Sequence, residues 1–212
     1  MSEAASRTDR GVHAKGQVVQ ILTAKEIVPK KLLRALNATL PSDIRVQEVE
    51  QTDSSFHVTL DCLAKTYVYH IDLGAGKNPF FSKFAWHYPY AIDFPKMQKA
   101  ASALIGERDF SAFSTGKTAD GMRHVYDIQL SFLESHVLRF VITGKSFLYK
   151  MARTIVGTLA DLGSSKLDLS ILPKLFTTGT RALCGATAPA HGLILQAVYY
   201  SKEKLCRDIL AK

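Results

Sequence analysis

The sequence predicts an α+β fold in which helices pack on one face of a mainly antiparallel sheet. The chain has 212 residues, 47% of them hydrophobic and 22% charged, so it carries enough apolar surface to bury a core. Helix-like and strand-like segments are mixed along it. Two strand-like segments, Met122–Leu133 and Val137–Thr143, are joined only by Glu134-Ser135-His136, and so short a connection indicates an antiparallel hairpin.

The sequence of the first quarter of the chain predicts a loop, a strand, a helix and a second strand. The loop covers Ser6–Gly16, and the apolar run Gln17–Leu22 follows it as a strand. Pro29–Leu40 is expected to be a helix, because proline suits the first helical turn and four leucines form an apolar stripe. Ile44–Val49 alternates apolar and polar residues as a strand should.

The middle of the chain predicts a long strand, a loop and a helix. Alternation is clearest over Ala64–Leu73, which is expected to be a strand. Residues 74–91 are rich in glycine, proline and aromatic residues and read as a loop. Asp93 is a suitable N-cap for a helix that extends to about Ile105.

The end of the chain predicts two helices, a strand and a helical tail. The longest helix is expected over Ser146–Leu162, with Gly163 ending it. A short helix follows around Leu169–Phe176, and Gly192–Tyr200 is expected to be the last strand. Two sub-structures are expected, divided near residues 52–64.

Composition excludes several classes of protein. Twenty-seven Lys and Arg against 19 Asp and Glu give a net charge of +8, which favours a polyanion partner, although many basic proteins bind none. No stretch approaches the roughly 20 apolar residues of a membrane span, and the polar first residues are not a secretory signal. Three widely spaced cysteines and scattered histidines match neither a disulfide framework nor a metal site. A cytoplasmic, metal-free protein is therefore expected.

The segment RTDRGVHA, residues 7–14, has the composition of a reactive loop. Asp9 lies between Arg7 and Arg10, and flanking cations favour the ionised carboxylate. An ionised aspartate suits a nucleophile, and Gly11 allows a tight backbone path. The alternative is a solvated ion pair in a surface loop, and spacing alone favours that alternative.

Two further segments carry candidate binding residues. Tyr67 and Tyr69 lie on one face of the predicted strand beside Lys65, where rings can stack on bases and the lysine can meet a phosphate. The alternative is that these residues pack at the edge of a core. Arg153 stands in an otherwise apolar helix, on one face with Tyr149 and Gly157. A carboxylate such as Asp9 would compensate its charge, and an exposed arginine is the alternative.

These segments together resemble the TruA family of tRNA pseudouridine synthases over nearly the whole chain. RTDRGVHAKGQVV, AKTYVYHI and SFLYKMARTIVGTL are similar to three motifs of the family, and NATLPSDIRV, GERDFSAFS and APAHGLILQAVYY fit in the same order. The resemblance implies that Asp9 is the catalytic aspartate and that Arg153 pairs with it. It also implies that Tyr67 is the active-site tyrosine and that Arg7 contacts RNA. Together with Lys65 and His13, these are the predicted substrate-binding residues.

The resemblance implies isomerisation of uridine to pseudouridine at positions 38, 39 and 40 of the tRNA anticodon stem-loop, without cofactor, metal or ATP. It implies a homodimer and a fold of two ferredoxin-like halves that share one sheet, with the catalytic cleft between them. Residues 1–60 and 61–212 would be the halves. A catalytically degenerate tRNA-binding or folding protein is the second hypothesis, and a basic interaction module is the third.

The sequence departs from the family pattern in two places. Family members normally have a strand and a helix before the catalytic aspartate, whereas this sequence begins eight residues before Asp9. We therefore expect the first half to lack that strand and helix. The family's Phe-His-Ala-Arg-Phe segment is present as residues 56–60, FHVTL, in which Thr59 replaces the arginine.

Overall fold

The computed structural model describes residues 2–116 and 119–210, which divide into two compact units. The small unit comprises Met1–Ser6 and Val18–Asp61, and the large unit comprises Arg7–Gln17 and Cys62–Lys212. The loop that carries Asp9 thus belongs to the large unit. The expected halves, residues 1–60 and 61–212, remain a prediction about catalytic organisation.

The small unit contains a two-stranded antiparallel ribbon and one helix. Strand β1 (Ser2–Ala4) pairs with β3 (Val19–Ile21), and helix α1 (Pro29–Thr39) begins with its proline, as the sequence predicts. The prediction of a strand at Ile44–Val49 is wrong, because this segment has no regular structure. The Asn37 side chain bonds both the N–H and the C=O of Val46, at 2.8 and 2.9 Å. A side chain of α1 therefore satisfies backbone groups that a neighbouring strand would otherwise pair.

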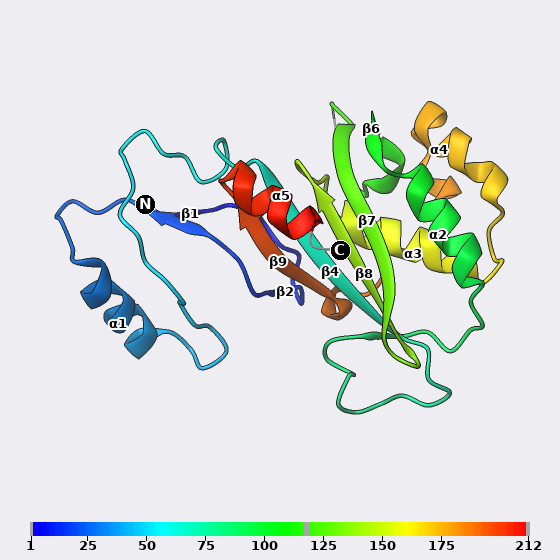
Figure 1. The fold of residues 1–212 in the computed structure, drawn as a ribbon, viewed down its shortest axis with the longest axis horizontal. Helices are drawn as coiled ribbons and strands as arrows, with labels where there is room; N and C mark the ends of the chain where they lie inside the picture. The colour runs from blue at the N-terminus through cyan, green and yellow to red at the C-terminus, as the bar shows by residue number, and fades with distance from the viewer. Residues whose placement is uncertain (1, 117–118, 211–212) are drawn as a thin grey trace. The chain divides into compact units, whose positions relative to one another are not determined.

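The large unit is built on a mixed, mainly antiparallel sheet of seven strands (Figure 1). In spatial order its strands are β2 (His13–Ala14), β9 (Leu193–Tyr199), β4 (Ala64–Asp72), β8 (Val137–Gly144), β7 (Met122–Glu134) and β6 (Gly106–Asp109), with β5 (Trp86–His87) beside β4. Only the β2–β9 and β4–β5 pairs are parallel. The expected α+β class, the β7–β8 hairpin and the strands at β4 and β9 are confirmed.

Three strands of the large unit lie where the sequence predicts none. The short strands β2 and β5 fall within the two segments expected to be loops, and β6 follows a helix directly. Each has two to four residues, too few for an alternation pattern. They form because longer strands, β9, β4 and β7, offer backbone groups for pairing.

Helices α2 (Phe94–Ala103) and α3 (Met151–Gly163) cover the core of the large unit. The Asp93 carboxylate accepts a bond from the Lys96 N–H at 2.9 Å, as the predicted N-cap requires. The cross-strand pairs of β4 and β8 place fully buried side chains on one sheet face, and α2 and α3 add others. The largest are Tyr69, Ile71, Leu138, Phe140, Met97, Met151, Ile155 and Leu159.

The remaining helices lie later in the chain. Helix α4 (Leu172–Thr178) follows α3, and α5 (Lys202–Leu210) forms the expected helical tail. Tyr199 of β9 donates its hydroxyl to Asp208 of α5 at 3.0 Å. It also bonds Thr66, whose side chain alternates with the core-facing Tyr67, so α5 contacts the opposite face of the sheet. The expectation that helices occupy one face is therefore wrong for α5.

Helix α3 begins five residues later than the sequence predicts. Residues 146–148 have no regular structure and residues 149–150 form a turn, in which Lys150 has the left-handed φ of 60° immediately before Met151. A non-glycine residue in this conformation breaks the helical path. Tyr149 consequently does not share a helix face with Arg153, which corrects the sequence-based expectation.

Within residues 2–116 and 119–210, no helix combines the length and the apolar character that a membrane span requires.

Candidate active site

The loop of residues 7–14 brings its carboxylate to helix α3. Arg153 Nη1 donates to Asp9 Oδ2 at 2.5 Å, joining positions 144 residues apart. The two side chains are only 13% and 16% exposed, so little water screens the pair. The contact therefore has the short, charge-assisted character of a strong hydrogen bond. Of the two alternatives for Arg153, a carboxylate partner or exposure to solvent, the structure shows the carboxylate partner, Asp9.

A second contact fixes the plane of the guanidinium. Arg153 Nε donates to the Ala188 carbonyl at 2.7 Å, and the Ala188 N–H returns a bond to the Arg153 carbonyl at 3.2 Å. Bonds along two edges of a planar group define its orientation as well as its position. The segment 184–189 thus acts as a brace for Arg153, and we call it the brace loop.

The brace loop lies against α3 because a glycine faces it. A Cβ on Gly157 would lie 1.7 Å from the Ala186 carbonyl oxygen, so no other residue fits without displacement. Thr158 Oγ1 accepts from the Gly185 N–H at 3.1 Å, and Asp161 Oδ2 accepts from the Ala186 N–H at 3.2 Å. Helix α3 therefore holds both Arg153 and the loop that orients it.

Arg181 fastens the brace loop from its other side. Its guanidinium donates to the Gly185 carbonyl and to Thr187 Oγ1, both at 2.9 Å. Tyr69 of β4 donates its hydroxyl to the Pro189 carbonyl at 2.8 Å. Burial raises the pKa of Tyr69, an effect that nearby Arg153 opposes, so the hydroxyl stays protonated and remains a donor.

The Asp9 loop itself closes by a backbone turn. The Val12 N–H donates to the Asp9 carbonyl at 3.0 Å, and Gly11 adopts a φ of 85° that favours glycine. His13 Nε2 bonds the Lys83 carbonyl at 2.8 Å, and its ring lies 4.8 Å from that of Phe84. His13, expected to bind substrate, thus anchors the loop to residues 83–84.

The other predicted binding residues lie in different surroundings. Tyr67 is 6% exposed and its ring meets Phe147 edge-on at 5.0 Å, as in the core-edge alternative. Lys65 is half-buried, and burial lowers its pKa while Cys62 opposes the shift. Arg7 and Arg10 are exposed. The structure joins Asp9 with Arg153 directly, and the substrate-binding roles of Arg7, His13, Lys65 and Tyr67 stay predictions.

Sequence reasoning missed three parts of this arrangement. Tyr69 appeared only as the partner of Tyr67, Gly157 only as a face neighbour of Arg153, and Ala188 only within the APAHGL segment. Every residue has a backbone carbonyl, so the residue type at position 188 could not indicate that this carbonyl would bind Arg153. Among the described residues, no group of three or more His, Cys, Asp or Glu is placed to hold a metal ion.

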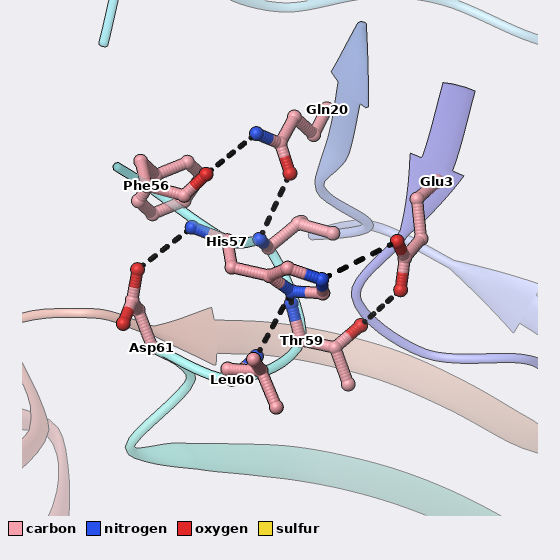
Figure 2. Close-up of polar contacts among 8 residues, drawn as sticks. Glu3, Gln20, Phe56, His57, Thr59, Leu60 and Asp61 are labelled. Carbon is pink, nitrogen blue, oxygen red and sulfur yellow. Dashed lines mark hydrogen bonds and ion pairs between the residues drawn. The ribbon is translucent and has the colours of Figure 1, made fainter. Parts of the chain in front are cut away.

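The FHVTL segment, residues 56–60, belongs to a polar cluster in the small unit (Figure 2). Gln20 bonds the Phe56 carbonyl at 2.6 Å and the Val58 N–H at 3.1 Å. His57 Nδ1 accepts from the N–H groups of Thr59 and Leu60, and its Nε2 lies 3.7 Å from Glu3. Thr59 donates its hydroxyl to Glu3 at 2.9 Å. The cluster fastens β1 to this segment.

Comparisons with known proteins agree with the sequence motifs. A family model described as tRNA pseudouridine synthase matches residues 100–201. The chain is 45% identical to tRNA pseudouridine synthase A 2 of Protochlamydia amoebophila, over 93% of this chain and 78% of that protein. It is 39% identical to tRNA pseudouridine synthase A of Bacillus pumilus and 38% identical to that of Latilactobacillus sakei. These alignments cover 93% and 92% of this chain, and 80% and 79% of the relatives.

Proposed function

Because the chain belongs to the tRNA pseudouridine synthase A family, we propose that it isomerises uridine to pseudouridine at positions 38, 39 and 40 of the tRNA anticodon stem-loop. The observation that carries the proposal is the bond between Asp9 and Arg153. It holds a carboxylate, the group that a nucleophilic role needs, at a position of low solvent exposure within the loop that most resembles the family.

Arg153 has two functions in this proposal. It supplies a counter-charge at hydrogen-bond distance from the carboxylate. It also aims the carboxylate, because the Ala188 carbonyl fixes the guanidinium. Arg153 engages Oδ2, so Oδ1 is the oxygen that we assign to the substrate.

The reaction is an isomerisation, so no atom is gained or lost overall. The glycosidic bond from uracil N1 to ribose C1′ breaks, the base turns, and a new bond joins C5 to C1′. The proton of C5 is released and N1 becomes protonated. Asp9 attacks either the sugar at C1′ or the base, and both alternatives remain open.

Substrate binding relies on charge and on base extrusion. A chain of net charge +8 attracts tRNA phosphates, and exposed Arg7 and Arg10 flank the nucleophile. The target uridine must leave its stack to meet Asp9. We assign to Tyr67 the apolar face against the uracil ring, which requires Phe147 to leave part of that face accessible.

We further propose the family's assembly for this chain. Two ferredoxin-like halves, residues 1–60 and 61–212, would share the sheet and form the catalytic cleft, and two chains would form a homodimer that contacts one tRNA. The reaction needs no cofactor in this proposal, and the site of action is the cytoplasm.

The test is pseudouridine mapping on unmodified tRNA transcripts. The protein is incubated with transcripts that carry uridine at position 38, 39 or 40 alone, and with one that carries cytidine at all three. Product is expected from the first three transcripts and not from the fourth. A folded protein that binds tRNA and forms no product contradicts the proposal and favours a non-catalytic tRNA-binding role.

A further inference from the structure

Two phenylalanines are strongly exposed in the loop of residues 77–84, KNPFFSKF, which follows β4 in the large unit. Phe80 is 89% exposed and Phe84 is 48% exposed. Phe81 is only partly exposed, and its ring lies 6.4 Å from that of His136. Because burial of apolar surface is favourable, two such phenylalanines in one short loop indicate a surface that another molecule covers. We call residues 77–84 the aromatic loop.

Hydrogen bonds within the aromatic loop give its backbone a defined conformation. The Asn78 side chain accepts from the Phe80 N–H at 3.0 Å. The Phe81 carbonyl accepts from the N–H groups of Phe84 and Ala85, both at 2.8 Å. The backbone that carries the exposed rings is therefore ordered before a partner binds, which lowers the entropy cost of binding.

Histidines fasten the end of the aromatic loop to the candidate active site and to the sheet. The backbone of residues 83, 84 and 85 bonds, in that order, His13 of the Asp9 loop, His70 of β4 and His191, which follows the brace loop. The ring of Phe84 also lies 4.8 Å from the ring of His13. The exposed surface of Phe84 thus adjoins the loop that carries Asp9.

Charge indicates what kind of molecule fits this surface. Lys77 and Lys83 are exposed, and residues 73–92 contain no Asp or Glu. Along the chain, exposed lysines therefore alternate with exposed aromatic rings. This is the combination with which proteins bind the phosphates and the unstacked bases of single-stranded RNA.

Base extrusion at Asp9 would create bases that need such a surface. A uridine must leave its stack to reach Asp9, and its neighbours in the strand then each lose a stacking partner. A phenyl ring can replace that partner whatever the base, because every base has a π-face. The contact of Phe84 with His13 places a ring on the side of the Asp9 loop, where such neighbours would lie.

We propose that Phe80 and Phe84 form a stacking platform for bases next to the reacting uridine, and that Lys77 and Lys83 contact the phosphates of the same strand. The inference rests on the proposed function, because that function brings a uridine of tRNA to Asp9. It assigns substrate binding to a loop that lies outside the sequence motifs.

Substitutions of Phe80 test stacking with little disturbance of the fold, because this side chain is almost fully exposed. Affinity for a labelled anticodon stem-loop RNA is measured by fluorescence anisotropy. Phe80→Leu remains apolar but loses the flat ring, and should weaken binding by about fivefold or more. Phe80→Tyr keeps the ring and should stay within about twofold of the unsubstituted protein. Phe132→Leu, the matched change at an exposed phenylalanine of β7, should also stay within about twofold.

Two results of this comparison would overturn the platform. Unchanged affinity in Phe80→Leu would leave the exposed rings to a different partner, such as an apolar protein surface. A loss in Phe80→Tyr as large as that in Phe80→Leu would show that the ring itself does not matter.

RNAs that lack one base identify the stacked nucleotide. Each nucleotide of the anticodon loop is made abasic in turn, and the RNAs are bound to Phe80→Leu and Phe84→Leu. At least one abasic RNA should bind each variant as tightly as it binds the unsubstituted protein, because the missing base has no stacking to lose. An equal loss on every RNA overturns stacking in favour of a general change in the loop.

Salt dependence tests the two lysines. Lys77→Ala and Lys83→Ala should each reduce the slope of log K against log salt by about one, as expected for one lost phosphate contact. Lys99→Ala, an exposed lysine of α2, should leave the slope unchanged. An unchanged slope in both loop variants overturns the phosphate contacts.

Pseudouridine formation is measured on the same preparations. RNA binding that depends on Phe80 and Phe84, without any product, contradicts the proposed function alone. Product from the unsubstituted protein, with RNA affinity unchanged in both leucine variants, contradicts the platform alone. A protein that binds no stem-loop RNA contradicts both.

Discussion

Two pairs of a carboxylate and a nitrogen-bearing cationic side chain, one in each unit, differ in their separation and in their exposure to solvent. Asp9 and Arg153 in the large unit lie 2.5 Å apart and are 13–16% exposed. Glu3 and His57 in the small unit lie 3.7 Å apart and are 51% and 42% exposed. The first pair is braced by the Ala188 carbonyl, and the second is part of a surface cluster (Figure 2).

The comparison indicates that solvent exposure and the nearest counter-charge determine whether a carboxylate suits a reactive role. Water and salt screen the Glu3–His57 pair, so it contributes little beyond local fastening. Poor solvation of the Asp9–Arg153 pair makes each group depend on the other, which holds the carboxylate in one position. A reactive role therefore fits Asp9 and not Glu3.

The largest effect is expected from Asp9→Asn. The amide has nearly the same shape and still accepts a bond from Arg153, but it is not a nucleophile. Pseudouridine formation per folded molecule should fall by at least about a thousandfold. Some stability should also be lost, because Arg153 is left without a counter-charge, so the rate is measured at a temperature where the variant is folded. Glu3→Gln, the matched change in the exposed pair, should leave the rate within about twofold. Comparable losses from both substitutions would remove the contrast between the pairs.

Arg153→Met should have the largest effect on stability. It leaves Asp9 charged and poorly solvated without a cation, so the free energy of unfolding should fall by about 3 kcal/mol. The measurement is urea denaturation, with His57→Gln as control, for which a loss below about 1 kcal/mol is expected. Adding Asp9→Asn to Arg153→Met should recover much of the loss. An unchanged double variant would show that the stability came from packing of the arginine.

Gly157→Ala tests whether the brace loop matters to the pair. The new methyl group would meet the Ala186 carbonyl, so the loop must shift and the Ala188 bond to Arg153 must lengthen. We expect a loss of about 1–3 kcal/mol in unfolding free energy and a fall in kcat larger than any change in KM. Gly163→Ala, also in α3, meets the flexible end of Met97 and should be milder. Equal effects would assign no special part to the brace loop.

The length of the periodic pattern of apolar residues explains which helices and strands were predictable from the sequence. Ala64–Leu73, Pro29–Leu40 and the β7–β8 hairpin have long periodic patterns, and the structure contains the expected elements there. Ile44–Val49 has a comparable pattern but lacks a neighbouring strand, because Asn37 bonds its backbone at Val46. Pattern alone cannot predict such a competition between side chain and strand.

The part of the candidate site that consists of charged side chains, the Asp9–Arg153 pair, was predictable from the sequence. An arginine in an apolar helix requires a carboxylate, and Asp9 was a candidate from its own loop. The brace was not predictable, because Ala188 contributes a backbone carbonyl. The exact start of α3 was not predictable either, because the left-handed turn at Lys150 interrupts a sequence that is otherwise suitable for a helix.

The smallest expected effect is on the pH dependence of stability, and it comes from His70. Unlike the two pairs compared above, His70 is a partly buried imidazole whose pKa is shifted by burial and cations and not by a carboxylate. Burial lowers the pKa of His70, and the cations Arg139 and Lys15 lower it further, against a bond with the Phe84 backbone. The folded state thus binds fewer protons than the unfolded state below pH 6.5, so stability should fall as the pH decreases through that value. His70→Gln should flatten this part of the stability profile, measured by urea denaturation between pH 5 and 8. A slope that is unchanged in His70→Gln would mean that burial of His70 without a counter-charge has no cost at this site.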